Sequence, residues 1–96
     1  MPKFMSAHTM PAGAMKREHV DQLAQAAQSD AVVRPYRSFL NLEKGKIVCV
    51  MEAPSQEVLS AWFQKMNVPC DYVVPAELEG DRGVVKTPES VKFPAA

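Results

Sequence analysis

Residues 47–51, with the sequence IVCVM, constrain the fold most because they offer apolar side chains to both sides of an extended strand. In such a strand Cys49 and its neighbours two positions away point one way, and Val48 and Val50 point the other way. A strand of this kind lies inside a sheet and needs cover on both faces. A chain of 96 residues has material for one hydrophobic core.

Hydrophobic periodicity predicts the other elements around this inner strand. Pro35 and Pro75 cannot donate a ladder hydrogen bond, so the strands that contain them are predicted at the two edges of the sheet. Asn67 and Pro69 end the second helix by residue 66 or 67. The predicted elements are a strand at 3–10, a helix at 16–29, strands at 32–40 and 47–51, a helix that begins at Pro54, and a strand at 71–78.

The order β-α-β-β-α-β predicts an α+β protein of the ferredoxin-like class. Two right-handed crossovers joined by a hairpin give a four-stranded antiparallel sheet, order 4-1-3-2, with both helices on one face. The other face would expose more apolar area than a soluble monomer tolerates, so we expect a homodimer through it, a dimeric α/β-barrel-type assembly with a pocket between the sheets. Residues 1–79 form this domain, and residues 80–96 are expected to be an extended C-terminal arm that could wrap a partner subunit.

Composition argues against several classes of partner. Eleven basic and eleven acidic residues cancel, so no overall charge attracts the chain to nucleic acid or anionic lipid. No apolar run approaches the roughly 20 residues of a membrane span, and the first residues lack a secretion signal, so a cytoplasmic location is expected. Two cysteines without a C-x-x-C spacing predict buried, reduced thiols.

A few side chains could carry chemistry. His8, in the middle of the first strand, could ligate a metal, transfer a proton or satisfy a backbone group. We expect His19 to face solvent and Trp62 to pack in the core, although an indole can also stack on a flat ligand. Arg34 and Arg37 either hold an anion or protect a sheet edge. No catalytic residue is assigned.

Some related functions lack their motifs. An RNA-recognition module of this topology needs aromatic residues on its third strand, and residues 45–51 contain none. A copper or zinc chaperone needs paired thiols in the first loop, where residues 10–15 offer only thioethers. The sequence has no Ser-His-Asp arrangement, H-E-x-x-H motif or phosphate-binding glycine loop.

Three segments resemble a known family: FMSAH at 4–8, GKIVCVMEAPS at 45–55 and VPCDYVV at 68–74. With these the chain resembles the small ferredoxin-like nickel-binding proteins, long described as a domain of unknown function. The resemblance covers about residues 3–79. It implies a dimeric α+β protein, usually bacterial and cytoplasmic, in a family of which some members bind nickel.

The resemblance also implies candidate metal ligands. His8 falls at the family's strand histidine and Cys49 at its strand cysteine. Members often have further histidines in both helices, at positions that Ala27, Trp62 and Met66 fill here. The ligand set of a nickel site is therefore incomplete in this chain.

Three functions follow as hypotheses. The first is a non-enzymatic, homodimeric binding protein whose pocket holds nickel, another divalent metal or a small apolar ligand. The second is a cofactor-free enzyme, like the dimeric ferredoxin-like monooxygenases and isomerases, with His8 as a proton-transfer group. The third is a dimeric interaction protein without a ligand. The second requires that His8 line a cavity large enough for a substrate.

Overall fold

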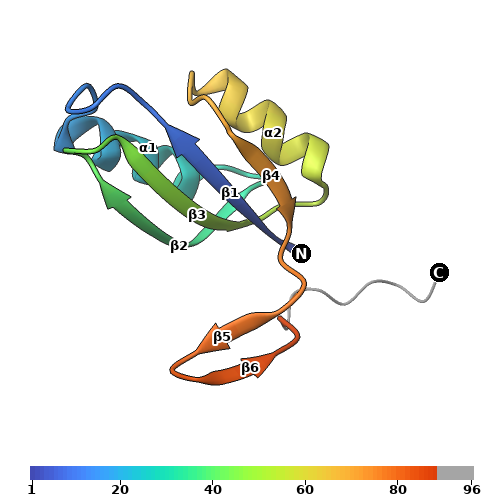
Figure 1. Ribbon diagram of the computed structural model, residues 1–96. Coiled ribbons are helices and arrows are strands. Elements are labelled where there is room, and N and C mark those ends of the chain that lie inside the picture. Colours follow the sequence, from blue (N-terminus) through green and yellow to red (C-terminus); the bar gives the residue numbers. More distant parts are fainter. Residues whose placement is uncertain (89–96) are drawn as a thin grey trace.

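The computed structural model describes residues 1–88, which form a four-stranded sheet with two helices, followed by a separate hairpin (Figure 1). The strand and helix order β-α-β-β-α-β is confirmed over residues 3–75. No helix in the described part of the chain has the length and apolar character needed to cross a bilayer. The elements are β1 (Lys3–Thr9), α1 (Arg17–Ser29), β2 (Arg34–Asn41), β3 (Lys46–Glu52), α2 (Gln56–Lys65), β4 (Tyr72–Pro75), β5 (Glu79–Asp81) and β6 (Val84–Lys86).

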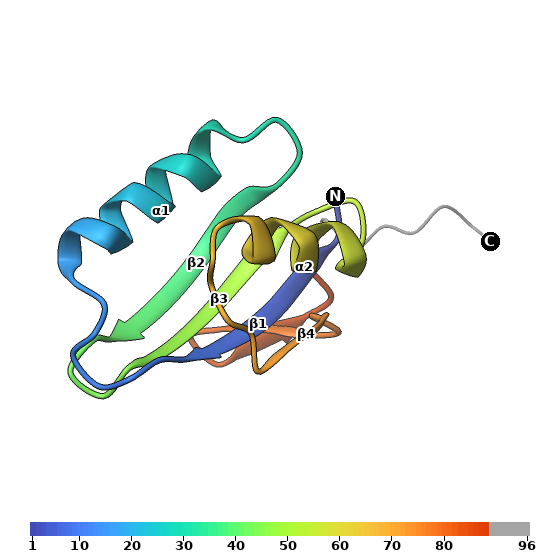
Figure 2. The ribbon, with the colours of Figure 1, turned by 90° about the horizontal axis from the view of Figure 1, so that it is seen from above.

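The sheet has the order β2-β3-β1-β4, which is the predicted order read from its other end. All neighbouring strands are antiparallel, and the two strands that contain Pro35 and Pro75 lie at the edges, as predicted. Both helices cover one face of the sheet (Figure 2). Because side chains alternate along a strand, the paired residues form rows across the sheet that face either the helices or the open side.

Helix α2 packs tightly on the sheet. Its Leu59, Trp62 and Phe63 are buried in one cluster with side chains of β1, β3 and β4. Ser55 is the N-cap, accepting a hydrogen bond from the backbone of Val58, so the helix begins later than the predicted Pro54. The helix ends at Lys65 with Met66 as its C-cap, by residue 66 as predicted, and Asn67 follows with a φ of 59°, which an asparagine tolerates.

Helix α1 contacts the sheet much less. Ala27 is its only buried residue, while Val20 and Leu23 are half-buried. All eight residues of β2, the strand beside α1, are exposed, including those on the helix side. The small side chains of α1 therefore leave the space between this helix and the sheet partly unfilled.

The expected arm contains an unexpected element. Residues 79–86 form the antiparallel β5–β6 hairpin, where the sequence predicted no regular structure. Arg82 and Gly83 both have positive φ, 51° and 84°, as in the two-residue turns that suit a hairpin's twist. The two strands have only three residues each, too few to produce a recognisable periodicity. The rest of the predicted arm, residues 89–96, lies outside the described residues.

Gly45 closes the turn between β2 and β3 against the end of β1. Its φ is 71°, its carbonyl accepts a hydrogen bond from Met10, and a Cβ added there would collide with the Met10 carbonyl oxygen. Gly13 has the same φ of 71° but nothing within 4 Å of an added Cβ. Alanine substitutions at these two glycines therefore distinguish the cost of a positive φ from the cost of the collision with Met10.

Gly45→Ala should lower the free energy of unfolding more than Gly13→Ala. Positive φ alone costs an alanine roughly 1–2 kcal/mol, which both variants lose. The collision with Met10 should bring the loss for Gly45→Ala to about 3 kcal/mol or more. Urea denaturation followed by circular dichroism measures both, and equal losses would contradict the close approach of the two loops.

Candidate functional site

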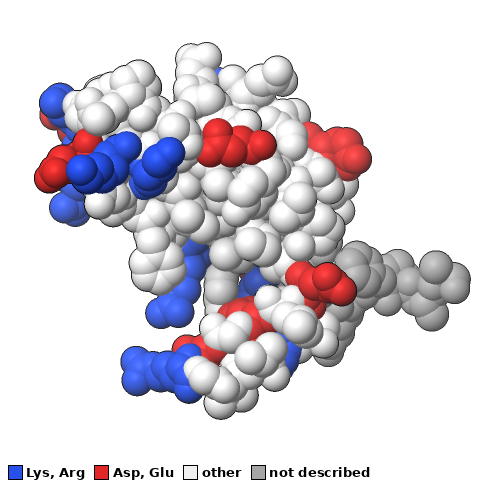
Figure 3. Space-filling model, in the orientation of Figure 1, with Lys and Arg blue, Asp and Glu red and all other residues white. Residues whose placement is uncertain are grey.

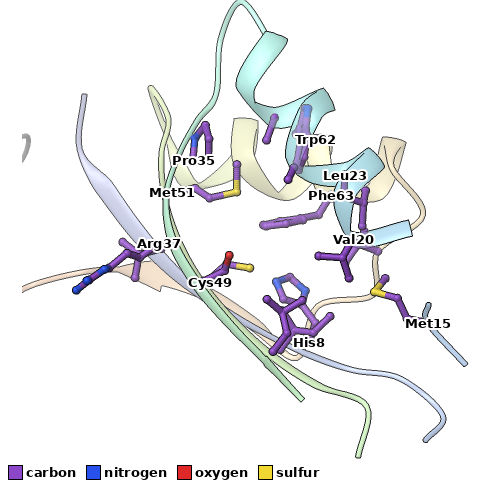
Figure 4. Close-up of a pocket in the computed structure, with 17 residues that line it drawn as sticks. His8, Met15, Val20, Leu23, Pro35, Arg37, Cys49, Met51, Trp62 and Phe63 are labelled. Carbon is purple, nitrogen blue, oxygen red and sulfur yellow. The ribbon is translucent and has the colours of Figure 1, made fainter. Parts of the chain in front are cut away.

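A cavity of about 110 Å³ lies between the helices and the sheet (Figure 4). The sequence predicted a pocket on the opposite face, between the sheets of two subunits. This cavity instead forms within one chain, because α1 stands off the sheet. Its lining comes from both helices, three strands and nearby loops, and includes His8, Met15, Val20, Leu23, Ala24, Ala27, Pro35, Ser38, Leu40, Ile47, Cys49, Met51, Trp62, Phe63 and Val68.

His8 extends from β1 into the buried side of the sheet and is 1% exposed. Its Nδ1 lies 2.8 Å from the carbonyl oxygen of Pro69 and its Nε2 lies 2.9 Å from the hydroxyl of Ser6. A carbonyl only accepts, so in the neutral ring Nδ1 carries the proton and Nε2 accepts from Ser6. Its ring also packs against Phe63, with centroids 4.5 Å apart. Both nitrogens therefore have partners within the protein.

The environment of His8 favours the neutral ring. Burial lowers the pKa of His8 below its usual value, against the opposing effects of the Pro69 carbonyl and the Asp71 charge. A charged imidazolium would gain little compensation among the apolar side chains around it. His8 is therefore a neutral, hydrogen-bonded group at the edge of the cavity.

Cys49 lies between two serines in one row of the sheet. The register pairs Cys49 with Ser6 on β1 and with Ser38 on β2. Burial raises the pKa of the Cys49 thiol to about 11, although hydrogen bonding with Ser6 and Ser38 acts in the other direction. The sulfur is therefore a neutral thiol at physiological pH, and a thiolate, the form that binds metals, is disfavoured.

Two of the three helix positions implied by the family resemblance lie with His8 and Cys49 at this cavity. Ala27 of α1 and Trp62 of α2 both line it, and the half-buried Met66 packs against the core cluster. The resemblance implied histidines at these positions, but this chain places apolar groups there. Among residues 1–88 no group of three or more His, Cys, Asp or Glu side chains could hold a metal ion.

The other candidate residues are exposed, and of these only Arg37 lies at the cavity. His19 is exposed, and its Nδ1 accepts a hydrogen bond from the backbone of Lys16 at the start of α1. Arg34 is exposed on β2, and the side chain of Arg37 points away from the cavity (Figure 4). Cys70 is exposed, so the prediction of two buried thiols is wrong for this cysteine, which lies in the loop before β4.

Sequence reasoning missed the two partners of His8. Alternation along β1 places Ser6 and His8 on the same face, so their proximity had a signal in the sequence. The Pro69 carbonyl had none, because it comes from the loop after α2, 61 positions further along the chain. These partners decide that the ring is internally satisfied.

We predict that nitrogen-15 NMR at pH 7 finds His8 neutral with its proton on Nδ1. Since burial lowers the pKa of the folded form, the unfolded chain binds more protons in the acid range. The free energy of unfolding should therefore fall as the pH drops below about 6.5, and this contribution should vanish in His8→Phe. A proton on Nε2, or a ring that is charged at pH 7, would contradict the assigned hydrogen bonds.

Comparison with known proteins agrees with the fold and with the resemblance. The model of the nickel responsive protein SCO4226-like family matches residues 4–75. The crystal structure of SCO4226 from Streptomyces coelicolor A3(2) superimposes with a TM-score of 0.68 at 22% sequence identity, covering 81% of this chain and 99% of that chain. A search of curated proteins found no match. Since the family model covers most of the domain, the chain belongs to the SCO4226-like family of nickel responsive proteins.

Proposed function

We propose that this protein is a non-enzymatic binding protein whose cavity takes up a small apolar molecule. The observation that carries the proposal is the chemistry of the cavity wall. Ala27 and Trp62 line it at the helix positions where the family resemblance implied histidines. Apolar cavity walls favour an apolar ligand, because its transfer out of water costs no hydration free energy that the cavity would have to replace.

The polar groups at the edge of the cavity support an apolar ligand. His8 bonds to Ser6 and to Pro69, and Cys49 is a neutral thiol between two serines. A ligand therefore need not satisfy any of these groups, and a polar ligand would compete with bonds that already exist. The polar groups thus limit the ligand class to compact hydrocarbons or aromatic rings with few polar atoms.

The size of the cavity sets the size of the ligand. A volume of about 110 Å³ is of the same order as the engineered apolar cavities, about 150 Å³, that bind benzene or xenon. Several residues that line the cavity, such as Pro35 and Ser38, are exposed, so the cavity is partly open on this side. Helix α1 is the more loosely packed of the two helices, since it buries only Ala27 whereas α2 buries three residues. We therefore expect α1 to move when a ligand enters.

Benzene should bind with a dissociation constant on the order of 1 mM and shift the NMR signals of Trp62 and Phe63 in a saturable way. Ala27→Leu fills part of the cavity and should abolish the shifts. Ala61→Leu, which adds the same atoms at an exposed position of α2, is the matched control and should leave them unchanged. Saturable shifts that survive in Ala27→Leu, or none in the parent protein, would contradict the proposal.

The cavity favours binding over catalysis. His8 lines the cavity, which the enzyme hypothesis required. A proton-transfer group needs a ring nitrogen directed at the substrate, and both nitrogens of His8 are engaged by Ser6 and Pro69. For this reason we do not propose an enzyme.

Nickel binding is the second candidate function, favoured because the family is named for nickel responsiveness and His8 and Cys49 line the same cavity. The donors fit nickel poorly. Nε2 would have to leave Ser6, Cys49 would have to lose a proton at a pKa of about 11, and two donors fall short of the several that such a metal requires.

Calorimetric titration with nickel decides this second function. A site at His8 and Cys49 predicts micromolar binding that is lost in His8→Ala and in Cys49→Ala. His19→Ala removes an exposed imidazole that does not line the cavity and should leave that binding intact. No heat at micromolar nickel, or binding that His8→Ala does not change, would remove nickel from consideration at this site.

We further propose that two copies associate through the helix-free face. The register aligns an apolar row across all four strands there: Phe39, Val48, Ala7 and Tyr72. Phe39 is 69% exposed in the single chain. A second row places Val50, Met5 and Val74 beside it. A contiguous apolar surface of this kind is typical of an interface, and a formal net charge of zero removes repulsion between copies.

A further inference from the structure

The β5–β6 hairpin stands on the helix-free side of the domain, apart from the four-stranded sheet (Figures 1 and 2). A hollow separates the hairpin from the body of the molecule in the space-filling view (Figure 3). The hairpin also lies beyond residues 4–75, the part of the chain that the family model matches. It is therefore an addition to the family domain, placed over the surface that we propose as the dimer interface.

A cluster of three side chains fixes where the hairpin leaves the domain. The Lys3 ammonium of β1 bonds to Oε1 of Glu79 at 2.8 Å, with both side chains less than 20% exposed. The same ammonium lies 3.6 Å from the centre of the Tyr36 ring on β2, and the Tyr36 hydroxyl donates to Glu79. Glu79 is the first residue of β5, so the hairpin is anchored across two strands of the sheet.

The pKa values of the cluster agree with this anchor. The hydrogen bonds from Lys3 and then from Tyr36 hold the pKa of Glu79 below its usual value. Burial alone would lower the pKa of Lys3, but the hydrogen bond and the charge of Glu79 outweigh it and raise that pKa. The carboxylate and the ammonium are therefore both charged near neutral pH, and each strengthens the other's contact.

Beyond its anchor the hairpin buries little, and none of residues 79–86 is buried. In the described part of the chain β5 pairs with β6 alone. Leu78, Val84 and Val85 are 63%, 65% and 64% exposed. A lone two-stranded hairpin is at best marginally stable in water, so these residues need an apolar surface to cover them.

We infer that the hairpin is a clasp, that is, a segment that binds a second copy of this chain and holds it against the helix-free face. The inference rests on the dimer proposed above. The second copy would enter between the hairpin and the apolar row, covering that row and the apolar side chains on the face of the hairpin that is turned toward it. A two-fold interface uses the same surface from each copy, so both hairpins would act at once. The charges suit this occupant, because residues 77–86 carry three acidic and two basic side chains, whereas the strands of the helix-free face carry Lys3, Arg37 and Lys46 against the single acidic Glu52. The two surfaces therefore have opposite net charge.

Sedimentation equilibrium of the full chain over a range of concentrations, with two sets of variants, tests the clasp. Phe39→Glu places a charge in the apolar row and should give monomers. Val84→Ser combined with Val85→Ser leaves the sheet face intact and should weaken the dimer at least tenfold. Gln25→Ser, at an exposed position of α1 on the other side of the sheet, is the control and should not change the dimer.

The outcomes separate the two proposals. A parent chain that stays monomeric, or a dimer that persists in Phe39→Glu, overturns both the dimer and the clasp. A dimer that Phe39→Glu breaks but the double valine variant leaves unchanged overturns the clasp alone. Neither result bears on the apolar cavity, which lies on the other face.

Hydrogen exchange on the unmodified chain provides a second test that needs no variant to fold. Backbone amides of residues 79–86 should exchange more slowly as the protein concentration rises, in step with the fraction of dimer. Amides of α2 serve as the internal reference, because that helix packs on the opposite face. Exchange in the hairpin that is independent of concentration while dimer forms would overturn the clasp.

Discussion

The pairing of β1 with β3 determines both surfaces of this protein. Their seven paired positions, from Lys3 with Glu52 to Thr9 with Lys46, fix which side chains face the helices. In this register Ser6, His8 and Cys49 face inward, while Ala7 and Val48 face the open side. A shift by one residue would exchange the two sets and leave the imidazole in solvent. The cavity and the proposed interface therefore depend on the same ladder of hydrogen bonds.

The inward side explains how this chain differs from what its family resemblance implies. A metal site needs several donors that are free to bind, whereas His8 is held by Ser6 and Pro69 and Cys49 remains a thiol. The helix positions of Ala27 and Trp62 contribute apolar surface to the same space. The cavity thus keeps the location of the implied site while its chemistry suits a different class of ligand.

The sequence predicted the sheet well because local signals determine it. Pro35 and Pro75 identified the edge strands, and the periodicity of α2 together with Asn67 identified the best-packed helix. The hairpin escaped prediction because its strands are very short, although the positive φ of Arg82 and Gly83 shows that the turn is well suited to one.

The candidate site was predicted only in part. Its residues His8 and Cys49 were found from the strand pattern and the resemblance. Which side of the sheet holds a cavity depends on how completely side chains fill the space between the helices and the sheet, and the sequence pattern does not give that volume. Periodicity does not report how far α1 stands from the sheet, nor that the carbonyl of Pro69 reaches His8. These features depend on packing between segments that are distant in sequence.

A crystal of the protein exposed to xenon gas tests the central claim most directly, because xenon occupies apolar cavities and offers no hydrogen bond. We expect a xenon atom between α1 and the sheet, close to Ala27 and Trp62, with the hydrogen bonds of His8 unchanged. Ordered water bonded to His8 or Cys49 in that space, or side chains that fill it completely, would contradict the account.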